Sequence, residues 1–297
     1  MKRTIIILLI FSFLYPLTMY GQTDWNAVKI NTINITDNIS YLNGRGGNIG
    51  VLYGVDGVMI VDDQYAELSD KIKKSLDSLS KNDLKFIVNT HYHGDHVGGN
   101  ENLSKNGASI VAHQNVRKRL GITFYSSMWE REVESKPETF WPVITFNDEI
   151  TFYFNEEEVQ IIHIPKAHTD GDALIYFKTS NIMHTGDGFV RYGYPFIDVS
   201  AGGSIDGMIA AQEKILEVAD ANTKIIPGHG GISSVDHVKE LLNMLKETRK
   251  IIADLKTAGK SLDECITSKP LEQYHKRWSG SFINSDLFVS LIYESMK

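Results

Sequence analysis

The chain has 297 residues, of which 42% are hydrophobic and 23% charged, and its formal net charge is −7. This composition is that of a globular protein with a sizeable core. The acidic balance argues against a nucleic-acid partner, because phosphate binding needs a basic face. The single cysteine, Cys265, excludes a disulfide bond within the chain.

The first 21 residues predict a secretory signal peptide. A positively charged start is followed by an apolar run over residues 4–14 and then by small or polar residues. The run is too short to span a bilayer comfortably. We therefore expect export to the periplasm or the medium, with no stable membrane insertion after cleavage; an uncleaved anchor is the alternative. Without Lys2 and Arg3 the chain keeps 28 basic and 37 acidic residues, a net charge of −9.

The remaining chain, 22–297, predicts a single α/β domain. Hydrophobic alternation predicts strands at 28–35, 39–42, 48–53 and 57–61. Asp62 and Asp63 end the last of these strands. An aspartate here can orient a metal-binding histidine, or it can cap the helix that apolar spacing predicts over 67–79.

The most informative stretch is Asn89-Thr90-His91-Tyr92-His93-Gly94-Asp95-His96-Val97-Gly98-Gly99, which follows a buried strand at 85–88. His91 and His93 alternate, so on an extended chain they point to the same side. Asp95 and His96 follow on a turn that Gly94 permits. Buried imidazoles and carboxylates must be paired or bound to a metal, and this set of ligands suits zinc. The motif predicts two adjacent metal ions.

Residues 121–141 interrupt an otherwise regular alternation of strands and helices. Ile122, Phe124, Tyr125, Met128 and Trp129 are large and apolar, and charged residues follow them. We expect a wall over the active site whose aromatic residues contact substrate. An ordinary amphipathic helix on the core is the alternative.

Further strands are predicted at 143–146, 149–154, 159–164, 173–177, 182–184 and 224–226, and helices at 113–120, 208–218 and 235–255. Residues 258–297 predict a helical appendage, with helices at 262–267 and 285–295. Three more strand ends carry unusual polar residues among glycines or in turns: His168, Asp187 and His229. Strand ends that share one rim of a sheet converge on one site, so we expect these side chains to join the first motif.

The order and spacing of these motifs resemble the metallo-β-lactamase fold superfamily over nearly the whole mature chain. The resemblance implies a four-layer αββα sandwich with two Zn²⁺ ions held by seven side chains: His91, His93, Asp95, His96, His168, Asp187 and His229. His91, His93 and His168 would hold the first ion. Asp95, His96 and His229 would hold the second. Asp187 would bridge the two.

One position departs from the zinc β-lactamases, which have a cysteine at the place of Asp187 or lack a bridging carboxylate. An aspartate there is similar to the glyoxalase II, lactonase and phosphodiesterase branches. The resemblance therefore implies an exported hydrolase that opens a lactam, a lactone or a thioester. A metal-dependent phosphodiesterase and a non-catalytic metal-binding protein are the alternatives.

The chemistry of such a site is hydrolysis by a hydroxide that bridges the metals. Asp95 is the candidate catalytic residue, because it can orient this hydroxide and pass its proton to the leaving group. Arg191, four residues after Asp187, is the candidate that binds a substrate carboxylate; a surface salt bridge is its alternative role. The expected partner is a small-molecule substrate, whose identity the sequence does not give. It does not give the oligomeric state either.

Overall fold

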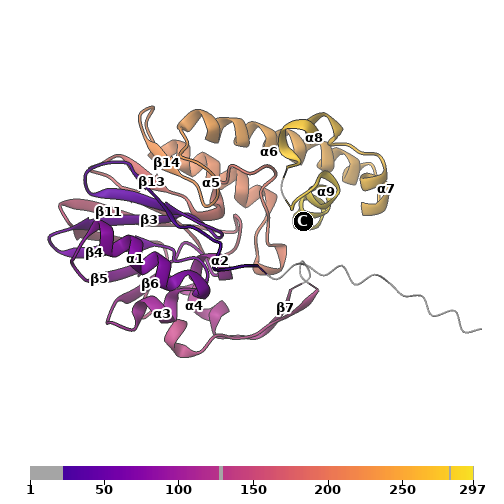
Figure 1. The fold of residues 1–297 in the computed structure, drawn as a ribbon. Helices are drawn as coiled ribbons and strands as arrows, with labels where there is room; N and C mark the ends of the chain where they lie inside the picture. Colours follow the sequence, from indigo (N-terminus) through magenta and orange to yellow (C-terminus); the bar gives the residue numbers. More distant parts are fainter. Residues whose placement is uncertain (1–22, 127–129, 281, 297) are drawn as a thin grey trace, which may run out of the picture.

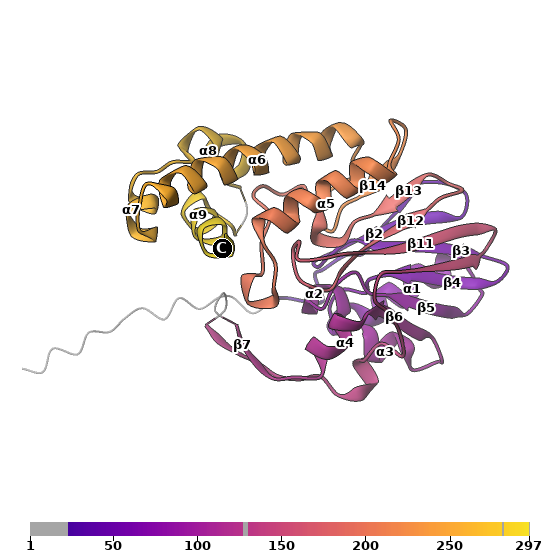
Figure 2. The ribbon, with the colours of Figure 1, turned by 180° about the vertical axis from the view of Figure 1, so that it is seen from behind.

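The computed structural model describes residues 23–126, 130–280 and 282–296, and in them two β-sheets lie face to face (Figure 1). Helices cover the outer face of each sheet, as the view from behind also shows (Figure 2). This arrangement confirms the four-layer αββα sandwich. The predicted signal peptide lies outside the described residues. Within the described part, no helix is long and apolar enough to cross a bilayer.

The first sheet joins an antiparallel half to a parallel half. Its strands, in spatial order, are β1 (Asn31–Asn34), β2 (Ile39–Asn43), β3 (Ile49–Gly54), β4 (Gly57–Val61), β5 (Leu84–Val88), β6 (Ser109–His113) and β9 (Ile144–Phe146). The pairs from β1 to β4 are antiparallel and those from β4 to β9 are parallel. Both faces of β4 are covered, which explains why every residue of this strand is buried.

The second sheet contains the later strands. They are β10 (Glu149–Phe154), β11 (Glu157–Ile164), β12 (Asp172–Phe177), β13 (Ile182–His184) and β14 (Lys224–Ile226). The pairs from β10 to β13 are antiparallel, and β13 pairs with β14 in parallel. Val159 and Ile161 of β11 face the first sheet and pack with Val61, Val88 and Val111. This shared apolar layer brings the strand ends of the two sheets to a common rim.

The outer helices fall into two groups. Beside the first sheet lie α1 (Ser69–Leu79), α3 (Asn100–Ser104) and α4 (Gln114–Leu120). Beside the second lie α5 (Ile205–Val218), α6 (Val235–Thr257), α7 (Leu262–Thr267), α8 (Glu272–Trp278) and α9 (Ser285–Ser295). Cys265 of α7 and Phe288 of α9 are fully buried in the cluster that α5 and α6 form with the second sheet. The described part of the predicted appendage thus contains helices that pack against α5, α6 and the second sheet.

Some segments differ from the sequence-based expectations. β1 is shorter than the predicted strand at 28–35, and α8 was not predicted. Residues 121–141 form no amphipathic helix in their described part, so that alternative is wrong there. They contain a hairpin of β7 (Phe124–Ser126) and β8 (Arg131–Val133) instead. The expected wall residues Met128 and Trp129 lie outside the described residues.

We expect Ile175→Ala to lower the free energy of unfolding by about 2–5 kcal/mol, because it would leave a cavity in the layer between the sheets. Ile175 is fully buried there and lies opposite Ile161 in the strand register. Denaturant unfolding of the metal-saturated protein measures this loss. Val55→Ala, at a side chain that is 89% exposed, is the control and should change little. Equal losses would contradict the packing described.

Candidate metal centre

The polar residues singled out in the sequence follow the carboxyl ends of strands at one rim of the sandwich. The motif at 89–99 follows β5 and includes the short helix α2 (Gly94–Val97), and His168 follows β11. Asp187 comes after β13, and His229 after β14. Because β13 and β14 are parallel neighbours, their ends bring Asp187 and His229 together.

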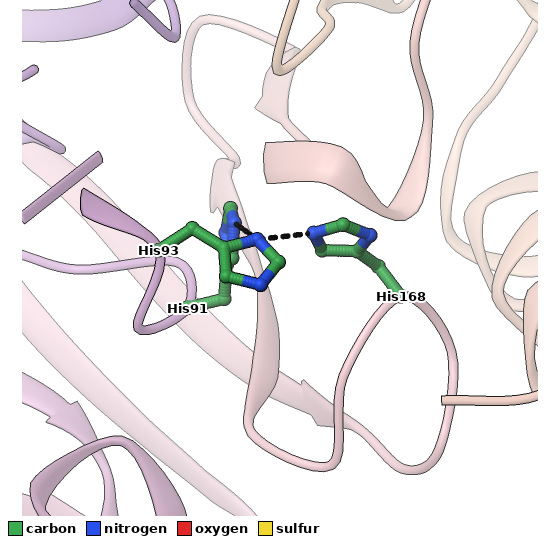
Figure 3. A group of neighbouring side chains, drawn as sticks. All are labelled: His91, His93 and His168. Atoms are coloured by element: carbon green, nitrogen blue, oxygen red, sulfur yellow. Dashed lines mark hydrogen bonds between the residues drawn. The ribbon is translucent and has the colours of Figure 1, made fainter. Parts of the chain in front are cut away.

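Three imidazoles converge at this rim. Figure 3 shows His91, His93 and His168 with their rings turned toward one another. Nδ1 of His93 lies 3.1 Å from Nε2 of His91 and 2.8 Å from Nε2 of His168. Two of the rings follow β5 in the first sheet and the third follows β11 in the second. The group therefore forms only when the two sheets pack together.

A chain of hydrogen bonds determines which ring nitrogen of His91 carries the proton. The hydroxyl of Thr90 donates its single proton to Oδ2 of Asp62 at 2.7 Å. Its oxygen must then accept from Nδ1 of His91, which lies 3.0 Å away. Nε2 of His91 is consequently unprotonated, and its lone pair faces the other two rings.

The same holds for the other two rings. Nε2 of His93 lies 2.9 Å from Oδ2 of Asp198, and Nδ1 of His168 lies 2.9 Å from the carbonyl oxygen of Phe196. Both partners are acceptors, so these nitrogens carry the ring protons. The lone pair on Nδ1 of His93 thus lies 3.1 Å from that of His91 and 2.8 Å from that of His168, a repulsive arrangement that a bound cation would relieve.

A second group lies directly beside the first. Nε2 of His229 is 3.3 Å from Nε2 of His96 and 3.3 Å from Oδ2 of Asp95. Nδ1 of His96 donates to Oδ2 of Asp62 at 2.7 Å, so in the neutral ring Nε2 carries a lone pair. Asp95, His96 and His229 can therefore hold a second cation.

Asp187 lies between the two groups. Its Oδ1 is 3.3 Å from Nε2 of His96 and 3.5 Å from Nε2 of His229, and its Oδ2 is 3.8 Å from Nε2 of His168. Oδ1 is buried and receives no hydrogen bond, which is costly for an anion unless a cation neutralises it. Gly228 permits this approach, since a Cβ there would lie 2.0 Å from Oδ1. The nitrogen and oxygen atoms of these side chains could thus coordinate a metal ion on each side of Asp187.

The ionisation of these groups follows from burial and from their neighbours. Burial lowers the pKa of His168 to about 4 and that of His91 well below its usual value, so both rings are neutral, as metal ligands must be. Burial opposes charge on Asp95 as well, but the adjacent His96 and His229 lower its pKa to about 2. Burial disfavours protonated His229, yet the nearby Asp187 raises its pKa to about 9. The carboxylates thus favour positive charge at the place where a metal would supply it.

Two carboxylates behind the ligands orient them. Asp62 accepts from His96 and from both the backbone N–H and the hydroxyl of Thr90, which is the contact that the orienting role predicts for an aspartate after β4. Neither Asp62 nor Asp63 caps α1. Asp198, which the sequence analysis missed, accepts from His93 and from the hydroxyl of Tyr92 at 2.6 Å.

The two groups of candidate metal ligands border a cavity of about 610 Å³. Asp95, Asp187 and His229 are among the residues that line it. Four aromatic residues and two arginines also belong to its lining: Tyr65, Tyr192, Phe196, Phe282, Arg45 and Arg131. Arg131 belongs to the hairpin β7–β8, so the segment expected as a wall does contribute to the cavity, through a cation. Neither arginine was singled out in the sequence.

The structure does not bring Arg191 to this cavity. Its guanidinium lies 3.6 Å from Glu240 of α6, and its side chain is not among the lining residues. Its backbone N–H donates to the carbonyl oxygen of His229 at 2.9 Å. The expected carboxylate-binding role is therefore unsupported, and the salt bridge that was its alternative is present. The physical reason is that the loop after Asp187 turns the side chain toward α6.

The αββα fold and a rim that gathers histidines and aspartates define a class of metal-dependent hydrolases. Residues 42–231 match the sequence profile of the Metallo-beta-lactamase superfamily, and the chain belongs to this family. Its seven candidate ligands all fall within the matched range.

Relatives with names agree with this assignment. The chain is 32% identical over 111 residues to a hydroxyacylglutathione hydrolase of Pelagibacter ubique (strain HTCC1062), a match that spans 37% of this chain and 38% of the relative. It is 23% identical over 276 residues to a metallo-beta-lactamase type 2 of Bacteroides fragilis, over 83% of this chain and 98% of the relative. The solved structure of a metallo-beta-lactamase from Pontibacter korlensis superposes with a TM-score of 0.62 at 15% identity, over 73% of this chain and 99% of that one, which supports the fold.

We expect Asp62→Asn to weaken divalent-metal binding by about 10- to 100-fold. The carboxylate accepts three hydrogen bonds. The side-chain NH2 of an asparagine would instead face one of the N–H or O–H groups that donate to Asp62. Titration with Zn²⁺ against a chromophoric chelator measures the change. Asp77→Asn, at an exposed aspartate paired with Lys73, is the control. Unchanged affinity in the Asp62 variant would contradict its orienting role.

Proposed function

We propose that this chain is a dinuclear zinc hydrolase that opens a cyclic or activated carbonyl compound: a β-lactam, a lactone or a thioester. The observation that carries the proposal is the position of Asp187, whose two oxygens face different ligand groups. The names of the relatives support an acyl substrate, since one is a hydroxyacylglutathione hydrolase and another a metallo-beta-lactamase. The acidic net charge supports a small molecule rather than a nucleic acid.

The donor set supports zinc as the metal. Among the described residues, imidazole nitrogens and carboxylate oxygens form the two groups of candidate ligands, and Cys265 is buried in α7. When bound, two zinc ions would polarise the substrate carbonyl and bring the pKa of a bound water near neutrality. His91, His93 and His168 would hold the first ion, Asp95, His96 and His229 the second, and Asp187 would contact both.

The chain's own catalytic work falls to Asp95. Its carboxylate lines the cavity and lies 3.3 Å from Nε2 of His229, so it faces both the ligands and the substrate space. We assign to it the orientation of the attacking water and the transfer of its proton to the leaving group. The aromatic residues Tyr192, Phe196 and Phe282 would exclude bulk water around the acyl group.

The direct test is hydrolysis by the zinc-loaded protein of a cephalosporin, a lactone, an aryl thioester and bis(4-nitrophenyl) phosphate. We expect turnover of at least one carbonyl compound, and at least 100-fold slower turnover in Asp187→Ala, which would lose the shared ligand. Asp236→Ala, at an aspartate side chain that is 87% exposed, is the matched control.

The pattern of turnover separates the alternatives. Hydrolysis of the phosphodiester alone would move the function to a phosphodiesterase. Two bound zinc ions without turnover of any compound would favour a non-catalytic metal-binding protein.

We also propose that the protein is exported. The charged start and the apolar run at 4–14 support a cleaved signal peptide. Expression in a bacterium with a secretory pathway should give a periplasmic or secreted product whose mass lacks about the first 21 residues. Leu8→Arg, which interrupts the apolar run, should hold the protein uncleaved in the cytoplasm, whereas Asp236→Ala should not. An uncleaved wild-type product would contradict the proposal.

A further inference from the structure

The arginines of this chain differ in their pairing. Seven lie in the described ranges, and five of them donate to a carboxylate or carbonyl oxygen or lie in an ion pair: Arg117, Arg119, Arg191, Arg249 and Arg277. Arg45 and Arg131 have no ion pair or hydrogen bond from the guanidinium to any described residue. Both line the cavity above the metal groups. The two arginines without such a partner in the described ranges thus lie at one place, in a chain whose net charge is −7.

Arg45 is held close to the metal ligands by its own turn. The next two residues, Gly46 and Gly47, pack directly on α2, where a Cβ would lie 2.6 Å from the carbonyl oxygen of Asp95 and 2.2 Å from Cε1 of His96. The backbone N–H of Gly47 also donates to the carbonyl oxygen of Asp95 at 3.0 Å. Larger residues would push this turn away, so the two glycines fix where Arg45 begins.

Arg131 lies at a junction between two spaces. It lines the main cavity and also a smaller one of about 190 Å³ beneath the hairpin β7–β8. The two spaces share His93, Gly94 and Arg131 as lining residues. A guanidinium at this junction can reach a substrate that extends away from the metal groups.

We propose that Arg45 and Arg131 bind a carboxylate of the substrate and thereby select anionic acyl compounds over neutral ones. The inference rests on the proposed function. Asp95 and Asp187 would be neutralised by the metals they hold, so the cavity would carry net positive charge and attract anions. A guanidinium binds a carboxylate through two parallel hydrogen bonds. Phe196 and Phe282 would contact the apolar part of the substrate between its carboxylate and its reacting carbonyl.

The test compares two substrates that differ in one charge: the mono-S-phenyl thioester of adipic acid and the methyl ester of this compound. Release of thiophenol reports the reaction in both cases. We expect Arg45→Gln and Arg131→Gln each to raise KM for the acid about tenfold, with kcat and the rates for the methyl ester nearly unchanged. Arg277→Gln, at an exposed arginine paired with Glu240, should behave as the wild type. Equal losses for acid and ester, or no loss for either, would overturn the inference.

A binding measurement separates failure of this inference from failure of the proposed function. Calorimetric titration of the metal-loaded protein with 4-phenylbutyrate and with its neutral amide needs no turnover. We expect the acid to bind more tightly, and this preference to fall about tenfold in each cavity variant but not in Arg277→Gln. A preference that is absent, or that survives in the double variant, would overturn the inference. If neither thioester reacts although the preference behaves as expected, the proposed thioester chemistry fails and the carboxylate site stands.

Discussion

The structure depends on one electrostatic constraint at the rim of the sandwich: the lone pairs of three imidazoles face one another, and a buried carboxylate oxygen lies beside them. His91, His93 and His168 each donate their ring proton to a partner on the far side of the ring, so the unprotonated Nδ1 of His93 lies 3.1 Å from the unprotonated Nε2 of His91 and 2.8 Å from that of His168. Oδ1 of Asp187 is buried beside them with no hydrogen bond. Such a set is repulsive alone and becomes favourable when cations bind, which is why metal binding and the order of the rim are coupled.

The fold supplies the rigidity that this constraint needs. The ligands follow strands of both sheets, and the apolar layer between the sheets fixes where those strands end. Asp62 and Asp198 then set the orientation of the rings. Gly228 leaves room for Asp187, since any side chain there would occupy the position of its carboxylate. The geometry of the candidate ligands therefore depends on the packing of the core.

Much of this was predictable from the sequence, and the physical reason is locality. The motif at 89–99 is short, follows a buried strand and holds four candidate ligands, so its chemistry needs no long-range information. Strand and helix patterns likewise predicted most of the elements, and the resemblance to the metallo-β-lactamase superfamily implied how they are layered. Asp198 was missed because it lies 105 residues from the His93 that it orients, in a loop whose sequence carries no distinguishing pattern.

The arginines also show what sequence spacing alone does not predict. Arg191 was selected because it is close to Asp187 in sequence, but its side chain turns toward Glu240. Arg45 and Arg131 are far from the motif's centre in sequence and reach the cavity through a turn and a hairpin. Exposure and pairing of a charged side chain are tertiary properties, so spacing alone could not separate these three arginines.

The measurement that tests this account most directly is X-ray diffraction from crystals of the zinc-loaded protein, recorded above and below the zinc absorption edge. The account predicts two anomalous peaks, one among His91, His93 and His168 and the other among Asp95, His96 and His229, with Asp187 in contact with both. A single peak, or none at this rim, would contradict it.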